Sequence, residues 1–148
     1  MKYNNKDFIV VATDGEIDLV QAVNYDEDMD YYLDIYLHDT DTLVGDVNYR
    51  FKTDTYTGNV GYNVYEEYRG HHYATKALLL LKELLHQRGF QNMVISVAPN
   101  NVASVKTALG AGSRLVCVRD VPPRYKLYSD SPSHQVLIYQ CETGERKK

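Results

Sequence analysis

Alternation of apolar and polar residues predicts strands in the first half of the chain. Between residues 31 and 64 the apolar positions recur at every second residue, which is the spacing of a half-buried strand. Polar turns at residues 39–42 and 52–58 divide this region into three expected strands: Tyr31–His38, Leu43–Phe51 and Val60–Val64. Because the connections are short, consecutive strands should pair antiparallel as a meander.

Two further apolar stretches, Phe8–Val11 and Glu16–Val20, precede this meander and are also expected to be strands. The dipeptide Asp14-Gly15 between them favours a tight primed hairpin turn. The segment Asn24–Asp30 then leads into the meander; it is acidic and shows no periodic pattern.

The hydrophobic period changes in the second half of the chain. From Tyr73 to Arg88 apolar residues recur every three or four positions, which predicts an amphipathic helix that Gly89 ends. A second helix should begin at Asn101, a good N-cap, place Val102, Val105 and Leu109 on one face, and end at Gly110 and Gly112. Three more strands are expected around this helix: Met93–Val97, Leu115–Val118 and Val136–Tyr139.

This order of elements predicts an α+β fold with a mixed sheet, in which an antiparallel meander is followed by β-α-β-α-β-β. The passage from Val60 to Val97 must be a parallel crossover, right-handed by the usual rule. We expect residues 1–148 to form a single domain, since the sequence contains no internal repeat, linker or low-complexity segment.

Composition narrows the functional classes. A net charge of −4 argues against a nucleic-acid-binding protein, which needs a clustered cationic face, and suits a cationic partner instead. Two cysteines fit a reducing compartment rather than a disulfide framework, and Cys117 is expected to be inert packing. No apolar run reaches the length of a membrane span and no signal-peptide pattern opens the chain, so we expect a cytoplasmic protein.

The stretch from Glu67 to Thr75 lies between a strand end and a helix start, where unpaired backbone N–H groups form an anion site. Gly70 lets the backbone approach a ligand closely, and the small Ala74 lets the first helical turn approach the neighbouring strand. The adjacent His71 and His72 could suggest a metal, but neither cysteine nor carboxylate stands at ligand spacing, and we expect no metal site.

This loop resembles the pyrophosphate-binding motif Gln/Arg-x-x-Gly-x-Gly/Ala of the GNAT superfamily of acyl-CoA-dependent N-acyltransferases. Arg69 and Ala74 match its first and last positions, whereas His72 stands where the family usually has glycine. The segment Asn101–Ser104 is similar to the family's Asn-x-x-Ser element, and the order of elements from Tyr31 to Cys141 matches the family's core. The resemblance covers about three quarters of the chain.

The resemblance implies an N-acetyltransferase in which acetyl-CoA, the co-substrate, lies in a V-shaped opening between the strand ending near Tyr65 and the strand Met93–Val97. Its pantetheine arm would bond to the backbone near Val64, and the N–H of Tyr65 or a neighbour would stabilise the oxyanion while an amine attacks directly. The implied cofactor-binding residues are Val64, Tyr65, Arg69, Gly70, His71, His72, Tyr73, Ala74, Thr75, Asn101 and Ser104.

The resemblance is weaker for the catalytic groups. Many members carry a general-acid tyrosine four residues after the serine, where this chain has Ala108. Tyr128, Tyr125 or water could protonate the leaving thiolate instead, and Glu66 or Asp46 could remove the proton from the amine. An alternative from another class is a non-catalytic acyl-CoA-binding module, suggested by the changed glycine and the missing tyrosine.

Members of the family usually place two helices between the first strand and the meander, and these wall the acceptor site. Residues 24–30 are too few for that pair, so the sequence predicts a shortened N-terminal helical region and an open, acidic approach for a polyamine or an exposed peptide amine. Another segment or a second subunit could equally fill the gap, because the sequence is compatible with a monomer or a homodimer.

Overall fold

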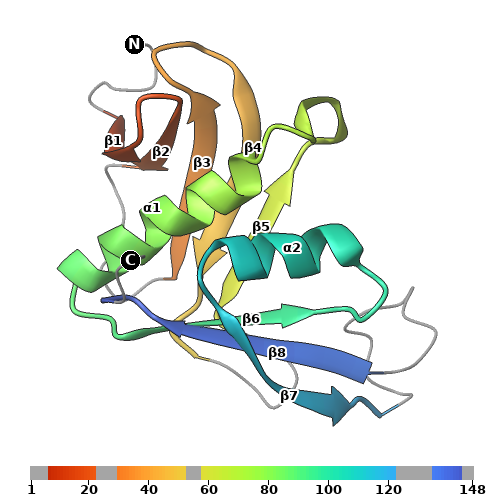
Figure 1. Cartoon of the computed structure of the whole chain (residues 1–148). Coiled ribbons are helices and arrows are strands. Elements are labelled where there is room, and N and C mark those ends of the chain that lie inside the picture. Colours follow the sequence, from red (N-terminus) through yellow and green to blue (C-terminus); the bar gives the residue numbers. More distant parts are fainter. Residues whose placement is uncertain (1–6, 23–29, 53–57, 123–134, 145–148) are drawn as a thin grey trace.

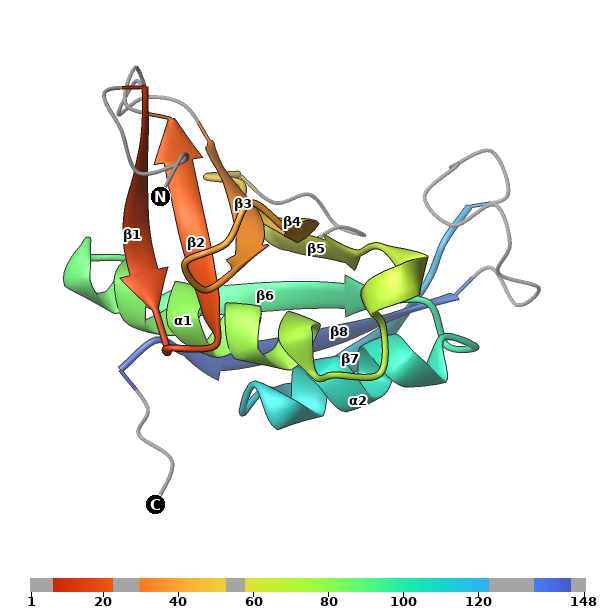
Figure 2. The same cartoon turned by 90° about the horizontal axis from the view of Figure 1, so that it is seen from above.

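The structure, a computed structural model, describes residues 7–22, 30–52, 58–122 and 135–144. These residues form one eight-stranded sheet in the order β1-β2-β3-β4-β5-β6-β8-β7. Helices α1 and α2 both lie on the same face of this sheet (Figures 1 and 2). The elements are β1 Phe8–Thr13, β2 Ile17–Ala22, β3 Tyr31–Leu37, β4 Leu43–Tyr49, β5 Val60–Val64, the 3₁₀ turn η1 Glu66–Tyr68, α1 Tyr73–Gln87, β6 Asn92–Val97, α2 Val102–Gly110, β7 Arg114–Asp120 and β8 Gln135–Glu142.

The predicted mixed sheet is confirmed. The strands from β1 to β5 pair antiparallel with their neighbours, so the three-stranded meander is extended to five strands by β1 and β2. The crossover through α1 brings β6 parallel to β5, and β8 then pairs antiparallel with both β6 and β7. No helix among the described residues is long and apolar enough to cross a membrane.

The turn between β1 and β2 has positive φ at one residue. Gly15 has a φ of +85°, whereas Asp14 is not in the left-handed region, which excludes a type I′ turn centred on Asp14 and Gly15. The Asp14 carboxylate instead accepts the backbone N–H groups of Glu16 and Ile17, each at 2.8 Å. These side-chain contacts stabilise the turn, together with the hydrogen bond from the Asp14 N–H to the Ile17 carbonyl at 3.3 Å.

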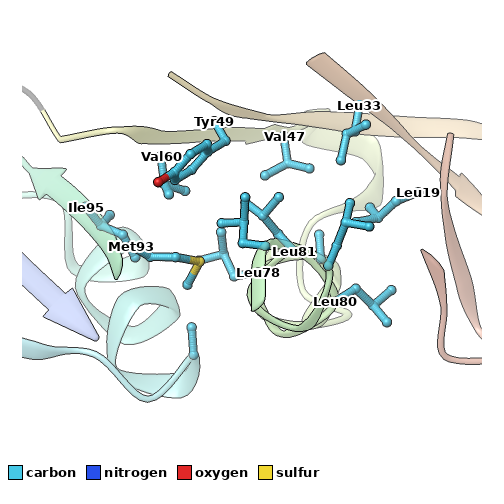
Figure 3. Close-up of a cluster of buried hydrophobic side chains, with 14 of the residues drawn as sticks. Leu19, Leu33, Val47, Tyr49, Val60, Leu78, Leu80, Leu81, Met93 and Ile95 are labelled. Carbon is cyan, nitrogen blue, oxygen red and sulfur yellow. The ribbon is translucent and has the colours of Figure 1, made fainter. Parts of the chain in front are cut away.

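The main core lies between the sheet and α1. Leu78 and Leu81 of the helix point toward strand residues that are also almost fully buried, as Figure 3 shows for Leu19, Leu33 and Val47.

Helix α1 ends at Gln87, one residue before the predicted Arg88. The N–H groups of Gly89 and Phe90 donate to the carbonyls of His86 and Leu85, and Gly89 has a φ of +89°. This Schellman arrangement is the physical reason why the predicted stop is right.

Helix α2 begins at its predicted cap but buries a narrower face than expected. Val102 and Leu109 are 63% and 53% exposed, so they do not share a buried face with Val105. Ala108 is fully buried, and Val105 packs against the core. The prediction assumed a wide apolar stripe, whereas the covered stripe of this short helix consists mainly of small residues.

Candidate active site

Strands β5 and β6 diverge soon after they begin. Within these described strands, Val60 and Ile95 are the paired positions, and Figure 1 shows the two strands separating beyond them. Asn59 holds the two strands together at the end where they lie close, because its side-chain oxygen accepts the N–H of Val94 at 2.7 Å. A Cβ at Gly58 would lie 2.1 Å from the Val94 carbonyl oxygen, so this close approach requires glycine. This separation of the two strand backbones, called the opening, lies where the resemblance implies it.

The hydrogen-bond pattern of β5 decides which backbone groups face this opening. The N–H of Tyr65 donates to the Val44 carbonyl at 2.9 Å, and the N–H of Arg50 donates to the Asn59 carbonyl at 2.7 Å. Hydrogen-bonded residues alternate along an antiparallel pair, so the backbone groups of Tyr62 and Val64 point away from β4, toward β6. The assignment of Val64 agrees with this geometry. The Tyr65 N–H already donates to β4, so of the expected oxyanion donors, Tyr65 or a neighbour, the geometry favours a neighbour such as Val64.

The loop between β5 and α1 has an unusual backbone. Gly70 has a φ of +93°, and His72, the N-cap of α1, has a φ of 63° and a ψ of 22°. The left-handed region normally favours glycine, so His72 occupies a conformation that suits the family's residue better than its own. Arg69 folds back and donates from Nε to the Val64 carbonyl at 2.9 Å, while the ring of His71 stacks on Tyr73 with centroids 5.3 Å apart.

The start of α1 presents unpaired donors to this loop. The first bond of the helix runs from the Lys76 N–H to the His72 carbonyl, so the N–H groups of Tyr73, Ala74 and Thr75 precede the helical ladder. The His72 side chain does not cap them. These donors lie at the positive end of the helix dipole, a favourable place for a phosphate. The backbone of this turn is thus compatible with the anion site, which stays a prediction.

The start of α2 borders the same opening. The Asn101 side chain accepts the N–H of Ser104 at 3.1 Å and so acts as the predicted helix cap. The hydroxyl of Tyr62 lies 2.5 Å from Oγ of Ser104 and donates to the Ser104 carbonyl at 3.2 Å. This contact joins β5 to α2 across the opening. Sequence reasoning missed Tyr62, because its alternation is that of any strand residue.

The candidate catalytic residues differ in how well they are placed. Glu66 is exposed in the first turn of η1, directly after β5. Tyr125 and Tyr128 lie outside the described residues. The structure adds Asp34, which faces Asp46 across β3 and β4. Burial and the Asp46 charge raise the pKa of Asp34, and burial raises the pKa of Asp46.

Metal ligation is not indicated by the described part of the chain, which contains no group of three or more histidine, cysteine or carboxylate side chains able to hold an ion. Cys117 is half-buried on β7 and Cys141 is buried on β8, and both are free thiols.

Comparisons with known proteins agree with the geometry. The sequence profile described as acetyltransferase (GNAT) domain matches residues 1–114. No curated protein sequence matches the chain at a significant level. Among solved structures, the microcin C7 self-immunity acetyltransferase MccE, in complex with acetyl-CoA and AMP, is 22% identical with a TM-score of 0.62, over 76% of this chain and 61% of that one.

Two further solved structures share the fold. The ribosomal-protein-S5-alanine acetyltransferase from Vibrio fischeri is 17% identical with a TM-score of 0.64, and the alignment covers 81% of this chain and 65% of that one. A GNAT-family acetyltransferase from Bacillus anthracis is 16% identical with a TM-score of 0.63, over 77% and 67% of the two chains. The chain thus spans slightly less than two thirds of MccE and of the Vibrio fischeri enzyme.

Proposed function

Since this chain belongs to the acetyltransferase (GNAT) domain family, we propose that it transfers an acetyl group from acetyl-CoA to a primary amine by direct attack in a ternary complex. One observation carries the proposal: the opening between β5 and β6 lies beside a helix whose first three N–H groups precede the helical hydrogen bonds and are not capped by the His72 side chain. A cofactor with a pyrophosphate and a long amide-containing arm is complementary to that combination.

The pyrophosphate binds the N–H groups of Tyr73, Ala74 and Thr75. Arg69, His71 and His72 are exposed around this turn, where their side chains can reach phosphate oxygens, and the positive φ of Gly70 shapes the loop. Each helix-dipole contribution is modest, about 0.3–1 kcal/mol at an exposed terminus, so affinity comes from several donors acting on one ligand. Asn101 and Ser104 border the cofactor from the α2 side of the opening.

The pantetheine arm lies along β5 as an additional strand. Its amides pair with the backbone at Val64, and the thioester reaches one step further back, toward Tyr62, because β5 runs from Tyr62 through Val64 to the phosphate loop. An N–H of these two residues then binds the thioester oxygen and stabilises the oxyanion that forms during attack. Holding the amine and the thioester together lowers the entropic part of the barrier.

The attacking amine must lose a proton, and Glu66 is the proposed base because it directly follows the strand that binds the thioester. The pair Asp34 and Asp46 is the second candidate, since carboxylates with raised pKa values are better bases near neutral pH. These carboxylates would also attract a cationic acceptor. A polyamine or a peptide N-terminus fits that approach.

A non-catalytic acyl-CoA-binding module is the alternative, favoured by His72 in the motif's glycine position and by the buried Ala108, which offers no hydroxyl. To separate the two, the protein is incubated with acetyl-CoA and either spermidine or a peptide with an N-terminal alanine. Release of free thiol together with an acetylated acceptor, seen by mass spectrometry, supports the transferase. Tight binding of acetyl-CoA, with no release of the CoA thiol in the presence of either acceptor, supports the non-catalytic module.

A further inference from the structure

Among the described tyrosines, Tyr62 is the one whose hydroxyl contacts the first turn of α2. Its oxygen contacts both Oγ and the carbonyl oxygen of Ser104, at 2.5 and 3.2 Å. The ring packs against the main core, and Tyr62 lies on the partly buried middle of β5. A phenol held at both ends in this way keeps its position during a reaction, because neither the ring nor the hydroxyl can turn away freely.

The backbone of the same residue faces the opening. The register of β4 and β5 directs the peptide groups of Tyr62 toward β6, while the side chain extends to the first turn of α2. A thioester bound along β5 would therefore lie beside the residue whose hydroxyl closes the helix side of the opening. One turn further along α2, the inward residue is Ala108, which carries no proton donor.

We infer that Tyr62 is a catalytic residue, the proton donor to the sulfur that leaves acetyl-CoA, and that Ser104 is its positioning residue. This inference rests on the proposed acetyl transfer. As the tetrahedral intermediate collapses, the C–S bond breaks with its electron pair on sulfur and the Tyr62 O–H proton passes to that sulfur. The products are the amide and the CoA thiol, and the phenolate regains a proton from solvent through the Ser104 hydroxyl.

The acidity of a phenol and the position of Tyr62 at the start of α2 both bear on this proton transfer. A phenol is a weaker acid than a thiol by about 1.5 pKa units, so proton transfer must accompany C–S cleavage rather than precede it. The transient phenolate would lie at the first turn of α2, where the helix dipole favours negative charge. The Ser104 hydroxyl can donate to it as well. Both effects reduce the cost of the charged intermediate.

The test compares Tyr62→Phe with Tyr68→Phe in the full chain. Tyr68 is a partly buried tyrosine that also packs against the main core, which makes it a matched control. Acetyl-CoA affinity is measured by calorimetry, and the pH profile of kcat is measured with spermidine or the N-terminal-alanine peptide, whichever the wild type acetylates. Tyr62→Phe should lower kcat by about 10²-fold and abolish the decrease of kcat at alkaline pH (the alkaline limb of the profile). Its acetyl-CoA affinity should stay within about threefold of wild type. Tyr68→Phe should match the wild type.

Ser104→Ala supplies a second readout. It should shift the alkaline limb to higher pH, because the phenolate loses a hydrogen-bond donor, and this change is not expected of a residue that only supports the fold. The inference is overturned if Tyr62→Phe retains the wild-type kcat and pH profile, or if its only defect is weakened acetyl-CoA binding. A wild-type protein that binds acetyl-CoA but acetylates neither probe overturns the proposed function itself, a different result from an active enzyme that does not need Tyr62.

Discussion

Asp34 and Asp46 are directly opposite each other on neighbouring strands, on the sheet face that points away from α1. The residues beside them in sequence, Leu33 and Val47, belong to the core under that helix, so the two carboxylates must lie on the other face. Like charges placed opposite in a sheet destabilise it, and burial adds to the cost of ionising them. A sheet that retains such a pair carries an unfavourable interaction at neutral pH.

Asp46→Asn should therefore stabilise the protein at neutral pH, by about 0.2–1 kcal/mol. The pKa values of both carboxyls are raised in the folded state. The loss of folding stability caused by ionising the two carboxyls is therefore absent below their unfolded pKa. It grows as the pH rises through their folded pKa and is complete above the folded pKa. Thermal unfolding from pH 3 to pH 7 should show the variant and wild type converging at pH 3. Equal stability at pH 7 would contradict this account.

Gly70→Ala should weaken acetyl-CoA binding at least tenfold, which corresponds to about 1.4 kcal/mol. A Cβ at Gly70 meets no neighbouring atom within 4 Å, so the effect arises from its φ of +93° rather than from a clash. Gly89→Ala is the matched control, since Gly89 has a φ of +89°, equally open surroundings and a place at the opposite end of α1. Both variants should lose about 1–2 kcal/mol of stability. Calorimetry showing equal affinity for the two folded variants would remove the loop from the cofactor site.

His72→Gly should stabilise the protein by about 0.5–1 kcal/mol. Glycine removes a left-handed strain of about 1–2 kcal/mol and costs about 0.5–1 kcal/mol of additional chain entropy. For a chain of this size the melting temperature should rise by about 1–4 °C. His71→Gly is the control, because His71 does not have a positive φ and should gain nothing. A lower melting temperature for His72→Gly would mean that the imidazole makes compensating contacts.

The elements were predictable where one period extends over many residues. The three- and four-residue spacing of apolar residues defines α1, and the observed helix differs from the predicted one by a single residue. The spaced residues that are buried against the core are Ala77, Leu78, Leu81, Leu84 and Leu85. The β1–β2 turn was not predictable, because its form depends on where the Asp14 carboxylate finds its donors. The exposure of Val102 and Leu109 depends on how much of α2 the sheet covers, which hydrophobicity alone does not indicate.

The candidate site could be proposed from the sequence in its loop and not in its tertiary pairs. The turn from Arg69 to Thr75 is contiguous in sequence, so its residues carry a readable motif. The Tyr62–Ser104 contact joins residues 42 positions apart, and the Asp34–Asp46 pair depends on strand register. The choice between the N–H of Tyr65 and that of a neighbour was open in the sequence for the same reason: a shift of one residue in register exchanges the groups that face β4 and the opening.

Glu66→Gln should lower kcat by about 10²-fold for the accepted amine while leaving acetyl-CoA affinity unchanged, because the amide cannot take up a proton. Glu67→Gln is the control, since Glu67 is the next exposed carboxylate in the same turn of η1 and should behave as wild type. Steady-state kinetics with the accepted amine, together with calorimetry, measures both quantities. Should Asp46→Asn show the larger loss, the Asp34–Asp46 pair is the base and Glu66 is not.

His38 should make folding more favourable at lower pH. Its Nδ1 lies 2.8 Å from the fully buried carboxylate of Asp18. This hydrogen bond, and then the charge of Asp18, raise the pKa of His38, with smaller contributions from Asp39 and Asp14. Because the folded pKa of His38 is raised above the ordinary histidine value of 6.5, the stabilising contribution of its contact with Asp18 is complete below pH 6.5. It is lost as the pH rises through the folded pKa. Thermal unfolding between pH 6 and pH 9 should show this decline in the wild type, whereas His38→Gln and Asp18→Asn should both flatten it. A decline that persists unchanged in His38→Gln would assign it to a different titrating group.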